Sequence, residues 1–210
     1  EKMLQTRDRC PVCAGTAHKP ECGYEWTTAY RCAGCRVVFL NPYVTHQGMK
    51  EIYASPQTLA RFFPFCDHYF EDTEKENRDT RTFRIYEQWL DRLSNLTAGR
   101  KLLDIGCGAG QFLKLAREKG WQAEGLEFDN ALEKKLQDQG IPVKTGDFFE
   151  MNLPENSYDI ITLWDVFEHF SEPVPALNRL RKLLKPDGFL LLACPKENSS
   201  LAWLARKFYQ

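Results

Sequence analysis

The chain contains 210 residues with a mass of 24.4 kDa, 43% of them hydrophobic and 27% charged, which suits one core of ordinary size with a small accessory module. A formal net charge of -1 and a pI of about 6.5 disfavour a protein that is drawn as a whole to nucleic acid or to an anionic membrane surface. No apolar run approaches the roughly 20 residues that a membrane-spanning helix needs, and the N-terminus shows no secretory signal. We therefore predict a cytoplasmic protein with no membrane span.

Two Cys-x-x-Cys pairs, with the sequences C-P-V-C and C-A-G-C, stand near the N-terminus, eighteen residues apart. This spacing is typical of zinc ribbons, in which two turns each point a pair of thiolates at one tetrahedral ion. The alternative is four unmetallated thiols or a redox pair. His18 and Cys22 are spare ligand candidates, expected instead in the hairpin between the pairs. We predict that residues 1–45 form a zinc ribbon with the ligands Cys10, Cys13, Cys32 and Cys35.

Residues 46–98 have a different character. Met49, Ile52 and Tyr53 recur at helical spacing, and an aromatic stretch follows over residues 62–70. We predict a helical linker or lid that packs on the next domain. Its second helix is expected to carry one apolar stripe made of Phe83, Tyr86, Trp89, Leu90 and Leu93.

From residue 99 to residue 210, short apolar runs alternate with amphipathic helices, which is typical of βαβ units. We predict an α/β fold of Rossmann-like type, with a mainly parallel sheet and helices on both faces. The helices are expected at Gln111–Lys119, through Leu136 and at Val174–Leu184. The strands are expected at Lys101–Cys107, Gln122–Glu127, Val143–Thr145, Tyr158–Trp164 and, after the turn Pro186-Asp187-Gly188, at Gly188–Cys194.

A glycine-rich loop follows the first of these strands. Gly106, Gly108 and Gly110 alternate there, which suits a sharp turn that a ligand approaches without obstruction by Cβ atoms; the alternative is an ordinary strand-to-helix turn. A dinucleotide-binding loop would have a further glycine where this chain has Gln111, which disfavours a nicotinamide enzyme. Asp104 suits a ligand that presents an ammonium group and hydroxyls, as S-adenosylmethionine does.

Two more acids end the next strands. Glu127 lies about 20 residues after the loop, where a carboxylate accepts hydrogen bonds from ribose hydroxyls. Gly146-Asp147-Phe148 offers an acceptor for an adenine amino group beside an aromatic side chain. Alternatively, Glu127 is an exposed strand-end acid and Asp147 caps local backbone.

Residues 102–110, Glu127, Asp147 and residues 158–169 together resemble class I S-adenosylmethionine-dependent methyltransferases. The resemblance covers about residues 102–194. It implies that the three loop glycines give backbone access to the cofactor and that Trp164 and Asp165 lie near its methyl group. It assigns the methionine end to Asp104, the ribose to Glu127, and the adenine to Asp147 and Phe148.

Methyl transfer needs alignment of the reacting atoms and a base. Asp165, Glu168 and His169 follow the fourth strand at the edge of the sheet where ligands of such folds bind. We predict His169 as the catalytic base, because its ordinary pKa near 6.5 suits proton acceptance. The alternative is that the Glu168-His169 pair serves as a helix cap or a structural hydrogen bond.

The N-terminal module resembles, more loosely, that of bacterial methyltransferases that act on sugar nucleotides and other small metabolites. We therefore expect a small-molecule methyl acceptor and no nucleic acid partner. The nearest alternative is a zinc-ribbon RNA methyltransferase, although basic residues are only in mild excess in the ribbon; a non-catalytic, cofactor-binding interaction protein is another. The resemblance also implies two strands after Cys194, whereas Ser199–Tyr209 predicts one helix, so we expect a chain truncated at its C-terminus.

Overall fold

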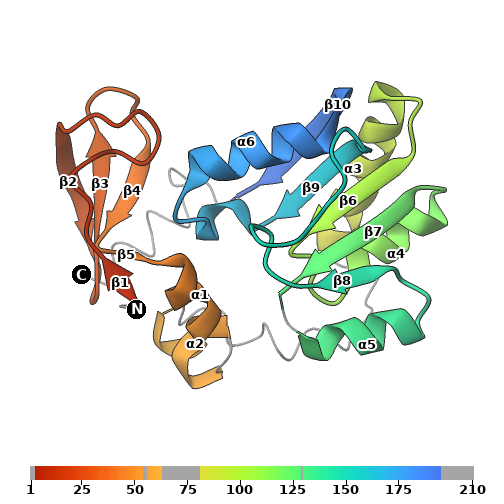
Figure 1. Ribbon diagram of the computed structural model, residues 1–210, viewed down its shortest axis with the longest axis horizontal. Helices are drawn as coiled ribbons and strands as arrows, with labels where there is room; N and C mark the ends of the chain where they lie inside the picture. The colour runs from red at the N-terminus through yellow and green to blue at the C-terminus, as the bar shows by residue number, and fades with distance from the viewer. Residues whose placement is uncertain (1–2, 54–55, 63–80, 129, 195–210) are drawn as a thin grey trace.

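The computed structural model describes residues 3–53, 56–62, 81–128 and 130–194. Figure 1 shows a small N-terminal β module beside a larger five-stranded sheet that is flanked by helices. None of the helices in these ranges is long and apolar enough to cross a membrane.

The N-terminal module consists of two small antiparallel sheets. The expected hairpin is present between the cysteine pairs: His18 begins its first strand and packs edge-on against Tyr30 and Phe39, and Cys22 is buried within that strand. The three-stranded sheet contains β2 (His18–Gly23), β3 (Thr28–Cys32) and β4 (Val38–Asn41), and the two-stranded sheet pairs β1 (Leu4–Gln5) with β5 (Tyr43–Val44).

Three helices connect this module to the large sheet: α1 (His46–Tyr53), α2 (Pro56–Phe62) and α3 (Arg81–Leu96). Met49 and Ile52 of α1 are buried, as their helical spacing predicts, in a cluster of their own with Val44 and Leu59. The predicted stripe on α3 is confirmed except at Trp89, which is 36% exposed. Tyr86, Leu90 and Leu93 lie three, seven and ten residues after Phe83 and share one face of the helix with it. Trp89 lies six residues after Phe83, which places it on another side of the helix.

The large sheet is entirely parallel, with the strand order β10-β9-β6-β7-β8. This confirms the predicted α/β, Rossmann-like fold. Its strands are β6 (Lys101–Ile105), β7 (Gln122–Glu127), β8 (Val143–Thr145), β9 (Tyr158–Trp164) and β10 (Leu184–Ala193), and the accompanying helices are α4 (Gln111–Glu118), α5 (Asn130–Asp138), the short 3-10 helix η2 (Phe167–His169) and α6 (Pro173–Leu183).

Helices cover both faces of this sheet, since successive side chains of a strand point to opposite sides. Leu102 and Ile160 face α3 and α4, where they pack with Phe112 and Leu113. Leu103, Ile105, Ile161 and Leu163 face α6 and pack with Ala176, Leu180 and Leu183.

The predicted start of the last strand is wrong. Strand β10 begins at Leu184, which pairs with Tyr158, and the Pro186-Asp187-Gly188 segment lies inside the strand, where the register shifts before Phe189. A Cβ atom at Gly188 would lie 2.9 Å from the carbonyl oxygen of Tyr158 and 3.1 Å from that of Lys185, so the segment folds tightly against β9 inside the strand. The predicted helix Ser199–Tyr209 lies outside the described residues.

Candidate functional site

The carboxyl ends of β6, β7, β8 and β9 meet at one edge of the sheet, because parallel strands all end on the same side. Asp104 lies within β6, and the glycine loop follows that strand directly. Glu127 ends β7, Asp147 follows β8, and Asp165 follows β9. The topology thus gathers the predicted residues at the edge where ligands of open parallel sheets bind.

The three glycines of the loop are glycine for two different reasons. All three have positive φ angles of 70°, 50° and 74°, which side chains other than glycine rarely adopt. A Cβ atom at Gly106 would lie 2.4 Å from Val166, and one at Gly110 would lie 2.6 Å from Leu136. At Gly108 no atom lies within 4 Å of that position. Close approach by a ligand therefore fits Gly108 best, whereas the protein's own side chains fill the space beside Gly106 and Gly110.

Glu127 holds the glycine loop in place. Its carboxylate accepts hydrogen bonds from the backbone N–H of Gly108 at 2.7 Å and of Phe128 at 2.6 Å. The side chain is buried, and charge-assisted bonds of this kind offset the cost of burying a carboxylate. Glu127 thus links the end of β7 to the loop that follows β6.

Asp104 is almost completely buried, with 2% of its surface exposed. The hydroxyl of Thr162 donates a hydrogen bond of 2.6 Å to its carboxyl group. Burial raises the pKa of Asp104 to about 8, and the nearby charge of Glu127 adds to the effect. Burial thus favours the protonated form of this carboxyl group.

Asp147 contacts helix α1. His46 and Lys50 both donate hydrogen bonds to its Oδ2 atom, and the backbone N–H of Phe149 donates to Oδ1 at 2.9 Å. Burial alone would raise the pKa of Asp147, but the bonds from Lys50 and His46 outweigh it and lower the pKa. The prediction of α1 as part of a linker did not include these contacts, although His46, Lys50 and Tyr53 share one helical face at spacings of four and seven residues.

The two aromatic side chains that follow these acids differ in exposure. The ring of Phe148 is buried in the core and stacks on Phe170, with 5.4 Å between the ring centroids. Phe128, which directly follows Glu127, is instead 39% exposed. Its position immediately after a strand-end acid is a feature of the sequence that makes it a candidate for the site.

Trp164 ends β9 and Asp165 follows it, and the two side chains lie in different environments. The indole of Trp164 packs against Tyr86 of α3 and Phe112 of α4, with ring centroids 4.8 and 5.2 Å away. Asp165 is exposed, has a φ angle of 53°, and has a pKa raised by partial burial. Burial and the charges of Asp104 and Asp165 raise the pKa of Tyr86. Tyr86, predicted only as part of an apolar stripe, therefore lies near two of the site's acids.

His169 ends the 3-10 helix η2 that follows β9. Burial lowers the pKa of its imidazole, and a hydrogen bond with the Asp165 backbone opposes the shift. The ring of Tyr53 in α1 lies edge-on to it, with 5.9 Å between centroids and 85° between planes. Two residues further on, the carbonyl of Ser171 accepts a hydrogen bond of 2.9 Å from Arg7. The N-terminal module therefore contacts the turn that carries the predicted base.

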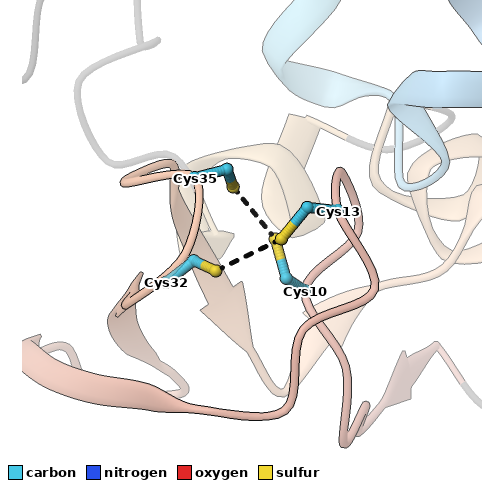
Figure 2. Close-up of side chains that lie close together, drawn as sticks. All are labelled: Cys10, Cys13, Cys32 and Cys35. Atoms are coloured by element: carbon cyan, nitrogen blue, oxygen red, sulfur yellow. Dashed lines mark hydrogen bonds between the residues drawn. The ribbon is translucent and has the colours of Figure 1, made fainter.

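The four paired cysteines form one cluster in the N-terminal module. Figure 2 shows their side chains pointing toward a common centre, with dashed lines joining Cys10 to Cys35 and Cys13 to Cys32. These two sulfur pairs are 3.6 and 3.5 Å apart, and all four Sγ atoms lie within 4.8 Å of one another.

This geometry fits a zinc ion. Tetrahedral zinc with bonds of about 2.3 Å separates its sulfur ligands by about 3.8 Å, close to the observed spacings. The pKa of Cys32 is lowered to about 6, first by the backbone N–H of Cys35 and also by the thiols of Cys13 and Cys10, whereas burial and the neighbouring thiols raise the pKa of Cys35 to about 12. Because the thiolate is the form that binds metal and these two shifts are opposite, the support for zinc comes from the positions of the four sulfur atoms.

A family model described as a methyltransferase domain matches residues 77–209, which include the glycine loop, the three strand-end acids and η2. The chain belongs to this methyltransferase family. A protein of Mycolicibacterium smegmatis named as a probable S-adenosylmethionine-dependent methyltransferase is 28% identical to it over 115 residues, which cover 54% of this chain and 45% of that protein.

Another similar methyltransferase is the ubiquinone biosynthesis O-methyltransferase of Paracidovorax citrulli, 28% identical over 159 residues, which are 71% of this chain and 66% of the relative. This methyltransferase chain thus spans about half to two thirds of the length of these two relatives. Among solved structures, an S-adenosylmethionine-dependent methyltransferase from Aquifex aeolicus is 21% identical with a TM-score of 0.47, covering 69% of this chain and 75% of that one.

Proposed function

We propose that this chain transfers a methyl group from S-adenosylmethionine to a small-molecule acceptor. The observation that carries the proposal is the glycine loop of a methyltransferase-family chain, held by Glu127 through the N–H of Gly108. The space beside Gly108 and the acids at three neighbouring strand ends are what this nucleoside requires. The sheet and its helices, residues 99–210, hold the cofactor, with residues 46–98 as a helical lid and residues 1–45 as a zinc ribbon.

Each residue at the edge has a proposed role. Asp104 accepts hydrogen bonds from the amino group of the methionine end, and Glu127 from the ribose hydroxyls, while Asp147 accepts one from the adenine amino group. The Phe128 ring offers the base an exposed apolar face. Trp164 and Asp165 lie near the methyl group, together with Tyr86.

The chemical step mainly requires the protein to align the acceptor with the methyl group. When bound, S-adenosylmethionine supplies a methyl group activated by its sulfonium. His169 accepts the proton that the acceptor loses, because burial lowers its pKa and leaves the imidazole neutral at pH 7. Its hydrogen bond with the Asp165 backbone restrains the ring.

Two observations favour a small molecule over RNA as the acceptor. The relative from Paracidovorax citrulli is named as a ubiquinone biosynthesis O-methyltransferase. Within the ribbon, Arg7 is bonded to Ser171 and Glu172, and Arg31 to Glu21, so these two cations already have protein partners. We propose a sugar nucleotide or another biosynthetic intermediate as the acceptor, methylated in the cytoplasm, where the ribbon's thiols stay reduced for zinc.

Binding and turnover of the full chain test this function separately. Isothermal titration with S-adenosylhomocysteine is expected to show micromolar or tighter affinity, lost when Asp104 and Glu127 are both neutralised in the Asp104→Asn, Glu127→Gln variant. Incubation with S-adenosylmethionine and a bacterial metabolite pool is expected to release S-adenosylhomocysteine. Absence of binding by the wild type, or binding that survives the double substitution, contradicts the proposal.

A further inference from the structure

Helix α1 reaches from the N-terminal module to the acid that ends β8. Lys50 lies 2.6 Å from Oδ2 of Asp147 and 3.1 Å from Glu150, and its Nζ atom lies 5.9 Å from the centre of the Phe128 ring. His46, one turn earlier, bonds to the same Oδ2 atom and lies edge-on to the ring of Phe149. Lys50 thus connects the segment after β7 with the segment after β8.

These contacts affect the ionisation and the rotation of the buried carboxyl group of Asp147. The side chain of Asp147 is only 4% exposed, and a buried carboxylate without partners loses its charge or destabilises the fold. Both donors from α1 bind Oδ2, whereas Oδ1 accepts from the Phe149 backbone. Since a carboxylate oxygen has two acceptor positions, this arrangement restrains the rotation of the group, and among the described residues Oδ1 has one partner where Oδ2 has two.

We propose that Lys50 is a positioning residue for the adenine base, acting through Asp147. By holding Oδ2, Lys50 keeps the carboxylate ionised and turned so that Oδ1 receives the 6-amino group. His46 assists from the same helical face. This inference rests on the proposed function, because it requires Asp147 to meet adenine. It makes an element outside the Rossmann-like domain part of the cofactor site.

Helix α1 is held firmly enough for this role. The hydroxyl of Thr45 accepts a hydrogen bond of 2.9 Å from the N–H of Gly48, and the N–H of Thr45 bonds to the carbonyl of Met3 at 2.9 Å. A Cβ atom at Gly48 would lie 2.4 Å from that same carbonyl oxygen. The first turn of α1 is therefore packed directly against the N-terminal segment, and Lys50 is placed by the N-terminal module.

The test compares two ligands that differ only at the base. The probes are S-adenosylhomocysteine and its analogue in which hydrogen replaces the 6-amino group. Wild-type protein is expected to prefer the amino compound. Lys50→Met is expected to bind S-adenosylhomocysteine about tenfold more weakly, the range of one charge-assisted hydrogen bond, with little change for the analogue. Lys50→Arg, which retains a charged donor, is expected to restore the preference.

A matched control is Lys185→Met, which removes a 2.8 Å pair between a lysine and a largely buried aspartate, Asp159, at the opposite edge of the sheet. It is expected to leave the preference for the amino compound intact. The inference is overturned if Lys50→Met loses affinity equally for both ligands or loses no affinity. It is also overturned if Lys50→Met binds more tightly, because Lys50 would then compete with adenine. If wild-type protein binds neither ligand, the proposed function itself is wrong.

Discussion

The carboxylate of Glu127 accepts a 2.7 Å hydrogen bond from the backbone N–H of Gly108. One strand-end acid therefore shapes the glycine loop on the neighbouring strand, and the proposed function has the same acid bind ribose. A residue with both tasks is expected to affect cofactor affinity more than ribose contacts alone explain.

Replacing Glu127 with Gln tests this dual role. Both of its oxygens accept from backbone N–H groups, and the amide NH2 of Gln would face one of these donors, at a cost of about 1–3 kcal/mol for a buried unpaired group. We expect a lower melting temperature and at least a tenfold loss of affinity for S-adenosylhomocysteine, measured by calorimetry. The control is Glu124→Gln on the same strand, which retains an acceptor for Tyr158 and should bind S-adenosylhomocysteine normally. Wild-type affinity in Glu127→Gln would contradict the dual role of Glu127.

The raised pKa of Asp104 predicts a dependence on pH. The folded protein keeps this proton up to about pH 8, whereas the unfolded chain loses it near pH 4. Between these values the folded state binds more protons, so this group makes the free energy of unfolding fall as pH rises.

Thermal melts between about pH 5 and pH 8 check that prediction against Asp104→Asn, which keeps the acceptor for Thr162. The melting temperature of the wild type should fall relative to the variant as pH rises. Its affinity for S-adenosylhomocysteine should increase over the same range, because the ligand's ammonium group favours the ionised carboxyl. Parallel pH profiles of the two proteins would contradict a titrating Asp104.

The predicted base is tested with His169→Asn. We expect kcat to fall by about 10²–10⁴-fold, the usual contribution of a positioned base, with affinity for S-adenosylhomocysteine unchanged. Because burial lowers the pKa of His169 below its usual value, the wild-type rate should be constant near pH 7 and decline only in more acidic buffer. His18→Phe, an aromatic replacement within the ribbon, is the control, and full turnover by His169→Asn would remove this residue from the mechanism.

Metal content tests the cysteine cluster. Purified protein is expected to contain about one zinc ion per chain, as four-thiolate sites do, and Cys32→Ser to lose it with a lower melting temperature. A chelator should have the same effect on the wild type. Cys22→Ser changes a buried cysteine outside the cluster and should retain the metal. Metal-free protein with an unaltered melting curve would contradict a structural zinc site.

Much of the fold was predictable from the sequence because local patterns encode it. Alternating apolar runs and helices gave the parallel sheet, and the four strands from Lys101 to Trp164 lie within two residues of their predicted ends. The predicted start of β10 was wrong because Leu184, which precedes Pro186-Asp187-Gly188, already pairs with β9, and the register shifts before pairing resumes at Phe189. The prediction for Trp89 was wrong because the predicted apolar stripe on α3 was wider than one helical face.

The sequence by itself determined the class of the protein: the spacing of the glycines, of the strand-end acids and of the cysteine pairs depends on chain geometry over a few residues. Only the tertiary structure decided which side chains meet across elements. The contacts of Lys50 with Asp147, of Tyr53 with His169 and of Arg7 with Ser171 join residues that lie far apart in the sequence. No local pattern specifies such contacts, because they arise from the packing of the N-terminal module and helix α1 against the edge of the sheet.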